Sequence, residues 1–227
     1  MRSGYTADVE GLRKDAARNR ARIVDAARDM AARGEPLALN AVARAADVGV
    51  GTVYRHFGST DELEEVLVWD RFEELAEIMR APGRAAGPAA GSAPGPARLE
   101  AVVAAHFALL AEDELFEKVT SRAAPALEQT AAMLASLVDG LAVLVAEARS
   151  AGRVRAEVDA PEVLVLVCGL AHAVRTAGLA PRSAPAQTLL HVVLDGLRGG
   201  NAGTAEQDLD EPTAPVTAGG RSRLGTR

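Results

Sequence analysis

The chain has 227 residues, of which 48% are hydrophobic, 25% are charged and only 3% are aromatic. This length can bury a core in one large or two small domains, and that core must be built of Ala, Leu and Val. The single cysteine, Cys168, excludes an intrachain disulfide and predicts a cytoplasmic protein. The most apolar run, residues 163–171, reaches only about half of the ~20 residues that span a bilayer, so no membrane partner is expected.

The first predicted element is a helix that begins near residue 13 and ends at Gly34. Residues 1–12 contain two glycines and little periodicity, which indicates a mobile arm, and they do not resemble a signal peptide. Apolar residues then recur at helical spacing on one face: Ile23, Ala26, Ala27 and Met30. Arg18 and Arg20 at the start of this helix are either DNA phosphate contacts or part of a solvated helix end.

Residues 39–57 predict a helix-turn-helix. An apolar face formed by Val42, Ala43 and Ala46 marks the first helix, and residues 47–49 break it. In the second helix Val53 and Phe57 lie four residues apart and should pack inward. The residues on its other faces are candidate DNA contacts: Val50, Gly51, Thr52, Tyr54, Arg55 and His56.

The side chains of this second helix suit DNA. Arg55 can form two hydrogen bonds with guanine, Thr52 can meet a base edge, and Tyr54 and His56 can bond phosphate oxygens.

The net charge of −6 argues against a nucleic-acid partner, but the distribution of the charge along the chain does not. Residues 1–58 carry ten Arg and Lys against seven Asp and Glu, whereas the rest of the chain carries 15 against 24. A basic module on an acidic body suits a protein that binds DNA at one end.

The run Ala45 to Phe57, AADVGVGTVYRHF, followed by STDEL at 59–63, resembles the DNA-binding signature of the tetracycline-repressor (TetR/AcrR) family. The resemblance covers residues 16–68 by motif and the rest of the chain only in length and helical character. It implies a regulator that binds DNA as a dimer. Three positions depart from the family pattern: Asp47 replaces a usual Gly, Ala38 replaces a usual Ser or Thr cap, and Thr60 replaces a frequent Lys. Thr60 is still expected to lie at the DNA.

A connecting helix is predicted over residues 59–80, after a break at Gly58. Ser59 and Glu62 fit a capping box at its start. Its early apolar residues should pack on the helix-turn-helix, and its later ones, Trp69 and Phe72, on whatever follows. This helix would therefore join the two halves of the molecule, and interdomain packing is the simplest role for its two aromatic residues.

The rest of the chain predicts a helical bundle. Residues 81–96 are rich in Pro, Gly and Ala, which indicates a flexible loop between domains, and residues 199–227 indicate a disordered tail. Residues 97–198 show helical patterns without strand-like alternation, so the fold class is all-α. The predicted helices cover 97–112, 114–121, 125–151, 161–179 and 184–198.

The last two helices carry apolar residues on more than one face, although a helix in a small bundle needs to bury only one. A self-association surface is therefore predicted, with a deep core inside one chain as the alternative. The family resemblance implies a homodimer through the same two helices. The residues expected in the interface are Leu164, Val167, Cys168, Ala171, Leu190, Val193, Leu194 and Leu197.

Catalytic and metal-binding patterns are absent from the sequence. It has no Ser-His-Asp spacing, no phosphate-binding glycine loop and no Cys/His cluster, so neither an enzyme nor a cofactor is expected. His106, His172 and His191 are dispersed, whereas a zinc site needs three or four converging ligands. Cys168 should be an inert thiol, because apolar neighbours raise its pKa.

These patterns and the resemblance together predict a sequence-specific transcriptional regulator. We expect a repressor whose homodimer binds a palindromic operator in double-stranded DNA and is released by an apolar or amphipathic small-molecule effector. The alternative is a helical small-molecule-binding or scaffolding protein that does not bind DNA. The effector should lie between the connecting helix and the C-terminal bundle, and the candidate pocket residues are Trp69, Phe72, His106, Phe107, Met133, Leu137 and His172.

Overall fold

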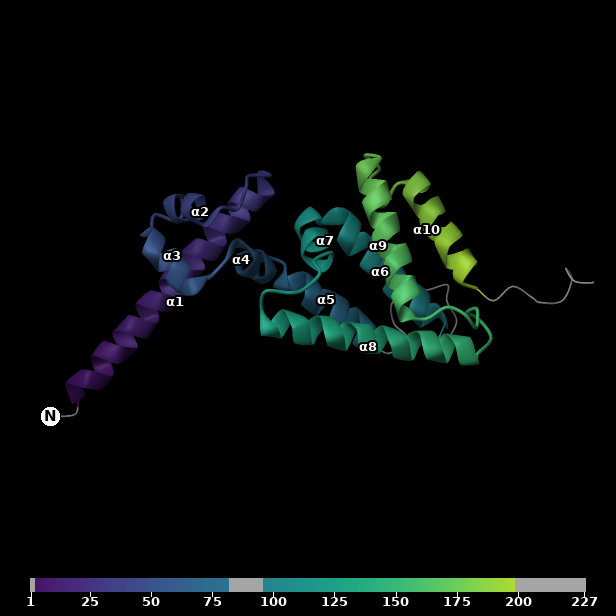
Figure 1. Ribbon diagram of the computed structural model, residues 1–227, viewed down its shortest axis with the longest axis horizontal. Helices are drawn as coiled ribbons and strands as arrows, with labels where there is room; N and C mark the ends of the chain where they lie inside the picture. The colour runs from purple at the N-terminus through teal and green to yellow at the C-terminus, as the bar shows by residue number, and fades with distance from the viewer. Residues whose placement is uncertain (1–2, 82–95, 199–227) are drawn as a thin grey trace, which may run out of the picture.

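The computed structural model describes residues 3–81 and 96–198, which form ten helices and no strand within those ranges. The all-α prediction is confirmed. Two groups of helices follow one another along the length of the molecule, with α1 to α4 on one side and α5 to α10 on the other (Figure 1). Nearly all of the predicted loop at 81–96 and the whole predicted tail at 199–227 lie outside the described residues.

The N-terminal group is built on one long helix. It comprises α1 (Ser3–Ala32), α2 (Leu39–Ala45), α3 (Val50–His56) and α4 (Thr60–Leu67). Helix α1 packs against the other three. The apolar faces of α1, α2 and α3 predicted from the sequence are buried together, with Ile23, Val42 and Val53 fully enclosed.

Of residues 1–12, predicted as a mobile arm, residues 3–12 belong to α1, and residues 1–2 lie outside the described residues. A glycine inside a helix costs about 1 kcal/mol relative to Ala. Gly11 stands among Glu10, Leu12, Arg13 and Lys14, which favour helix. The strong helix that follows therefore extends backwards through Gly11 and Gly4.

The predicted turns have the expected backbone chemistry. Gly34, just after α1, has φ +69°, and Asp47 in the turn between α2 and α3 has φ +50°, a conformation that Asp tolerates better than most residues. Ser59 Oγ accepts a hydrogen bond of 3.1 Å from the amide of Glu62. The Glu62 carboxylate accepts from the amide of Gly58, at 2.7 Å, and not from that of Ser59, so the capping box is shifted by one residue.

The connecting segment is two helices, and the prediction of one continuous helix over 59–80 is wrong. Helix α4 ends at Leu67, and α5 (Trp69–Arg80) begins after Val68, which has φ −97° and ψ 5°. Leu63 packs in the N-terminal core and Phe72 in the C-terminal core. Nine residues apart on an ideal helix, these side chains would point in opposite directions. The break at Val68 lets each one reach its own core.

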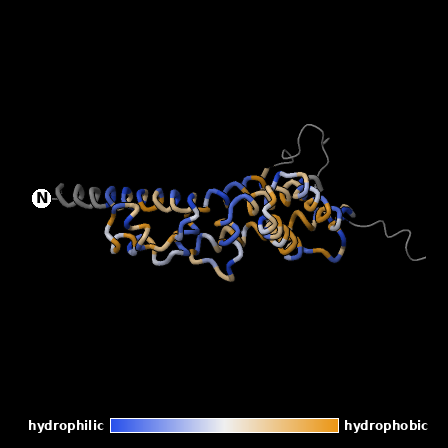
Figure 2. The backbone as a smooth tube through the Cα atoms, turned by 90° about the horizontal axis from the view of Figure 1, so that it is seen from above, coloured by the Kyte–Doolittle hydropathy of each residue, from blue (hydrophilic) through white to orange (hydrophobic). Residues whose placement is uncertain are grey.

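The C-terminal group, which we call the body, surrounds α6 (Pro96–Glu112). Helix α6 packs against α5, α7 (Glu114–Thr120), α8 (Glu128–Ser150), α9 (Ala160–Thr176) and α10 (Ala184–Leu197). These bounds agree closely with the predicted helices. Phe72 and Phe116 meet edge to face at 5.0 Å in the core. The tube coloured by hydropathy shows the most hydrophobic segments gathered in the body (Figure 2).

Among the described helices, α8 alone is long and apolar enough to cross a membrane, with 23 residues and a mean hydropathy of 1.8 in its most apolar window. The sequence analysis did not single it out. One face of α8 packs in the core of the body through Leu141, Leu144 and Val145. A helix that packs on one side against other helices can have this length and composition. Length and hydropathy alone therefore do not identify α8 as a membrane span.

Candidate DNA interface and ligand cavity

Helix α3 presents the residues predicted to contact DNA. Val53 and Phe57 are buried, as predicted, and fix the helix against α1 and α2. Tyr54, whose exposed fraction is 51%, and Val50 and Arg55 point to solvent. Thr52 and His56 are partly buried. The outward face of α3 therefore combines one cation, one phenol and one apolar side chain on a rigidly packed helix.

Two details prepare this face for a close approach. Arg55 Nη2 donates a hydrogen bond to Thr52 Oγ1 at 3.1 Å, which holds the guanidinium along the helix surface. A Cβ atom added at Gly51 would meet nothing within 4 Å, so this backbone faces open space. A groove wall could reach the start of α3 without a side chain in the way.

Helix α1 brings cations close to the helix-turn-helix. The guanidinium of Arg20 lies 5.4 Å from the centre of the Phe57 ring. Arg22 Nη2 donates to the carbonyl oxygen of Asp47 at 2.9 Å and to its carboxylate at 3.2 Å. Arg18 is exposed and pairs with Asp15 on its own helix, and Thr60 begins α4 in a partly buried position.

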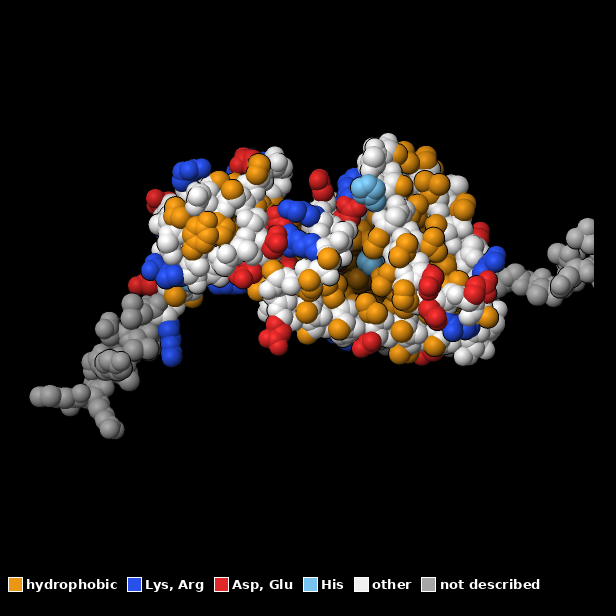
Figure 3. All heavy atoms as spheres, in the orientation of Figure 1, with side chains coloured by type: hydrophobic (Ala, Val, Ile, Leu, Met, Phe, Trp, Pro, Cys, Tyr) orange, Lys and Arg blue, Asp and Glu red, His pale blue; other side chains and the backbone are white. Residues whose placement is uncertain are grey.

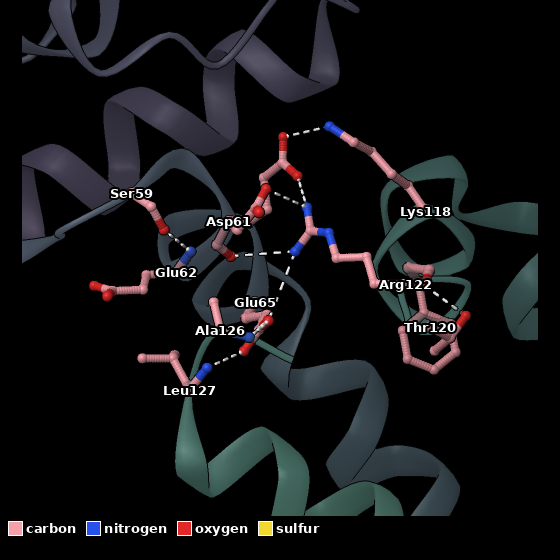
Figure 4. A network of polar contacts seen from close by, with 11 residues as sticks. Ser59, Asp61, Glu62, Glu65, Lys118, Thr120, Arg122, Ala126 and Leu127 are labelled. Atoms are coloured by element: carbon pink, nitrogen blue, oxygen red, sulfur yellow. Dashed lines mark hydrogen bonds and ion pairs between the residues drawn. The ribbon is translucent and has the colours of Figure 1, made fainter. Parts of the chain in front are cut away.

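A polar junction between α4 and the body was missed by the sequence analysis (Figure 4). Glu64 is almost fully buried, and its carboxylate receives Lys118 Nζ at 2.7 Å and the guanidinium of Arg122. Arg122 also contacts Asp61 Oδ1 at 3.1 Å. The partners of Glu64 lie 54 and 58 residues further along the chain, so no local pattern could have revealed this junction.

The neighbouring Glu65 links α4 to α8 (Figure 4). It is fully buried, and its two carboxylate oxygens accept hydrogen bonds from the amides of Ala126 at 2.6 Å and Leu127 at 2.9 Å. Leu127 is the N-cap residue of α8 and has no cap from its own side chain. Because a helix N-terminus favours negative charge, Glu65 caps α8 from the DNA-binding side of the molecule.

The body contains a cavity of about 270 Å³ between α5, α6, α7, α8 and α9. Its wall is almost entirely apolar. Figure 3 shows the molecular surface hollowed between α8 and α9, with hydrophobic side chains inside the hollow. The lining residues are Phe72, Leu75, Met79, Val102, His106, Phe116, Thr120, Leu134, Leu137, Val138, Leu141, Leu164 and Cys168.

Of the predicted pocket residues, Phe72, His106 and Leu137 line this cavity. The other four lie outside this cavity. Phe107 is enclosed in the core and Met133 packs against it, while the Trp69 indole donates to Glu73 at 2.9 Å. The side chain of His172 is 69% exposed and lies 3.0 Å from a carboxylate oxygen of Glu117. Adjacent residues of a helix point about 100° apart, so only the packing decides which of them meets a cavity.

The polar groups of the cavity wall are few and uncharged. Burial lowers the pKa of His106 to about 4, so its imidazole is neutral near pH 7. No hydrogen bond to His106 occurs within the described part of the chain. The Thr120 hydroxyl lies 2.9 Å from the carbonyl oxygen of Phe116 and donates within its own helix. Burial raises the pKa of Cys168, as predicted.

Most residues predicted in the dimer interface lie on the inward faces of α9 and α10. Leu164 and Cys168 line the cavity, and Val193 is partly buried. The remaining five are buried in the core of a single chain: Val167, Ala171, Leu190, Leu194 and Leu197. The large hydrophobic residues exposed on the same helices are instead Val165, Leu166, Leu189 and Val192.

Comparison with known proteins adds two matches to family models. The model described as bacterial regulatory proteins, tetR family, matches residues 23–66. The model described as the C-terminal domain of SbtR-like transcriptional regulators matches residues 99–199. The first covers the helix-turn-helix, and the second covers most of the body. No curated protein matches the chain.

Several solved structures are similar to this chain. One is a TetR transcription regulatory protein from Mycobacterium vanbaalenii, with 30% identity over 82% of this chain and 99% of that one and a TM-score of 0.40. Another is FadR from Bacillus subtilis in complex with stearoyl-CoA, with 18% identity over 78% and 98% and a TM-score of 0.53. A third is a tetR family regulator from Shewanella sp. PV-4, with 16% identity over 80% and 98% and a TM-score of 0.55.

Proposed function

The chain belongs to the tetR family of bacterial regulatory proteins and is a DNA-binding transcriptional regulator, and from this premise we propose that it is a repressor released from its operator by a small molecule. The observation that carries the proposal is the physical link between the outward face of α3 and the cavity in the body. Proteins of this family are regulators and not, in general, enzymes. We place this one in the cytoplasm, where bacterial DNA is accessible.

Base reading is assigned to α3. Arg55 and Thr52 read base edges in the major groove, Val50 contacts a thymine methyl, and the backbone at Gly51 approaches the groove wall. The exposure of Val50 and Arg55 supports this assignment. Breaking the bond from Arg55 to Thr52 costs little, because the guanidinium exchanges it for contacts with a base.

Phosphate anchoring is assigned to residues around α3. Tyr54 and His56 come from α3 itself, Arg18 and Arg20 from α1, and Thr60 from the start of α4. The contact of Arg20 with the Phe57 ring supports its place beside the recognition helix. Such contacts fix the register of the protein on DNA and make its affinity depend on salt.

A homodimer is proposed on the exposed faces of α9 and α10. Val165 and Val192, with exposed fractions of 72% and 63%, and their neighbours Leu166 and Leu189 give a single chain an apolar patch in water. A second copy covers this patch across a two-fold axis. Two copies bring two α3 helices to half-sites spaced by about 34 Å, so the operator is a palindrome in double-stranded DNA.

The coupling between ligand and DNA runs through α8. Its residues Leu134, Leu137 and Leu141 form one wall of the cavity, and its N-terminus is held by Glu65 of α4. Helix α4 in turn packs against α1. A ligand that binds better to one position of α8 therefore shifts α4 and the spacing of the two α3 helices. The stearoyl-CoA complex of Bacillus subtilis FadR supports ligand binding by this fold.

Selection of DNA by the purified chain tests the proposal. The full chain is incubated with random duplexes, the retained DNA is sequenced, and binding of the selected site is measured at two salt concentrations. We expect a palindromic site whose affinity exceeds that of random DNA by at least about 10³ and falls steeply with salt. Enrichment of no sequence would instead support a helical binding or scaffolding protein without DNA binding.

A further inference from the structure

The wall of the cavity holds no charge that could receive a charged ligand. No Asp, Glu, Lys or Arg is among its lining residues, and the histidine there is neutral near pH 7. A buried ion without a partner costs several kcal/mol or changes its protonation state. An ionised carboxylate, phosphate or ammonium group placed inside would therefore be strongly disfavoured.

One polar group nevertheless faces this apolar space. The imidazole of His106 is partly buried, lines the cavity and has no hydrogen-bond partner in the described residues. The other polar side chains offer less, since the Thr120 hydroxyl is used within α7 and the Cys168 thiol is a weak donor. A ligand that fills the cavity covers this imidazole, and because covered polar groups nearly always have a partner, the ligand is expected to supply one.

The size of the cavity limits the apolar part of the ligand. The cavity has a volume of about 270 Å³. It lies just below the ~300–1,000 Å³ typical of small-molecule sites. The ligand is therefore expected to be small, and most of its atoms contact aliphatic side chains.

We propose that the effector is a small uncharged hydrophobic molecule with one oxygen group, a hydroxyl or carbonyl, that hydrogen-bonds to the imidazole of His106. This inference rests on the proposed function for the claim that the ligand controls DNA binding. The neutral imidazole can donate through one nitrogen and accept through the other, so it serves either oxygen group. The ligand enters between α8 and α9, where the surface is hollowed (Figure 3).

Direct binding to the full chain without DNA tests the ligand class. The probes share one chain length and differ in the polar end: nonanol, nonanoate and nonylamine, with nonane as the purely apolar reference and stearoyl-CoA as the large anionic alternative. Binding is followed at pH 7 by calorimetry and by the fluorescence of Trp69. The centre of the Trp69 ring lies 6.3 Å from that of Phe72, which lines the cavity. We expect nonanol to bind about tenfold tighter than nonane, as one hydrogen bond of 1–1.5 kcal/mol implies. The two ionised probes should bind weakest.

Variants of His106 test the role of the imidazole. His106→Leu should abolish the preference for nonanol over nonane, while His106→Gln, which keeps a neutral hydrogen-bonding group, should retain most of it. His191→Leu changes an exposed histidine on α10 and serves as the matched control. Thermal melting confirms that each variant is folded. If His106→Leu unfolds, the comparison of His106→Gln with the probe series still decides the question.

Three results would overturn the ligand class. These are tighter binding of nonanoate or stearoyl-CoA than of nonanol, an unchanged nonanol preference in His106→Leu, and no saturable binding of any probe. Failure of the proposed function looks different, because it shows in the DNA selection and leaves these titrations readable. A chain that binds nonanol but selects no DNA sequence would keep the ligand class and lose the repressor.

Discussion

Arg55 and Tyr54 are adjacent on α3 and both exposed, yet their chemistry assigns them different work on DNA. We expect Arg55→Ala to cost about 1–3 kcal/mol of binding to the selected site and to relax the preference at one base pair, because a base contact is lost. Tyr54→Phe removes only a phenol oxygen and should weaken all sequences alike. Binding to the selected site and to single-base variants of it measures both effects.

The control for Arg55→Ala is Arg44→Ala, which removes an exposed cation from the last turn of α2 and should leave the base preference unchanged. Equal, sequence-independent losses in Arg55→Ala and Tyr54→Phe would contradict the assignment of base reading to Arg55.

The buried imidazole of His106 also makes stability depend on pH. Its pKa is about 4 in the folded chain and 6.5 as a free group, so between these values the unfolded state binds the extra proton. The contribution of His106 to the free energy of unfolding is therefore full above pH 6.5, and the free energy of unfolding falls by about 3 kcal/mol as the pH drops to 4. Urea unfolding at pH 7 and pH 5 should show a smaller loss for His106→Leu than for the natural chain. His191→Leu should keep the full loss, and an identical pH dependence in all three would contradict this account.

Local backbone chemistry could be read from the sequence at this scale, whereas the direction of most body side chains could not. The left-handed Asp47 and the glycine after α1 follow from properties of single residues. His106 and its neighbour Phe107 were both expected in the pocket, but only His106 lines it, because the position of α6 among five other helices decides which one does. Spacing within one helix carries no information on its neighbours.

At the scale of elements, α8 depends on a carboxylate from another helix. Glu65→Ala removes the acceptor of two part-buried hydrogen bonds, from the amides of Ala126 and Leu127, and a hydrogen bond to a charged group contributes about 1.5–3 kcal/mol. We expect a loss of about 2–5 kcal/mol in urea unfolding, since Glu65 meets two amides. Glu65→Gln keeps one acceptor oxygen and should lose less.

The coupling role of Glu65 predicts a second effect, which stability alone does not explain. At a temperature where Glu65→Gln is fully folded, ligand should bind the free variant normally but release DNA less effectively. Glu62→Gln, which alters the cap of α4 itself, is the matched control. Unchanged release of DNA by ligand in Glu65→Gln would exclude coupling through the start of α8.

Periodicity found the helices of the body with nearly correct ends, because each helix buries an apolar stripe. It did not find the break at Val68, since α4 and α5 each look regular and the change of direction comes from the two cores that they serve. The acidic pair Glu64 and Glu65 was overlooked for a related reason. Their partners lie more than fifty residues away in the chain, beyond the reach of local pattern.

At the scale of the whole molecule, the dimer surface gives the sharpest prediction. Val192→Arg places a charge in the centre of the proposed interface, where an unpaired buried charge costs several kcal/mol. The variant should be a folded monomer by light scattering and should lose most of its affinity for the palindromic site. Val143→Arg on the outer face of α8, where the exposed fraction is 57% against 63% at Val192, is the control and should remain a dimer.

Leu194→Arg does not test the interface, because Leu194 is enclosed in the body core and its replacement would disturb the fold of one chain. A Val192→Arg variant that scatters light as a dimer, with unchanged DNA affinity, would move the interface elsewhere. The faces of α9 and α10 that meet solvent depend on how the body packs. For this reason the sequence could indicate self-association but not its residues.

The interruption at Val68 bears on how motion can travel through the molecule. A single straight helix from Thr60 to Arg80 would act as a stiff rod, and a push at one end would appear at the other. Two short helices that meet at one residue can change their angle there, so a movement of α5 along its axis is transmitted poorly to α4. The bracing that α4 receives from Glu64 and Glu65 lies to the side of this joint. A displacement of α7 or of the start of α8 therefore reaches α4 directly through these contacts, without passing along α5.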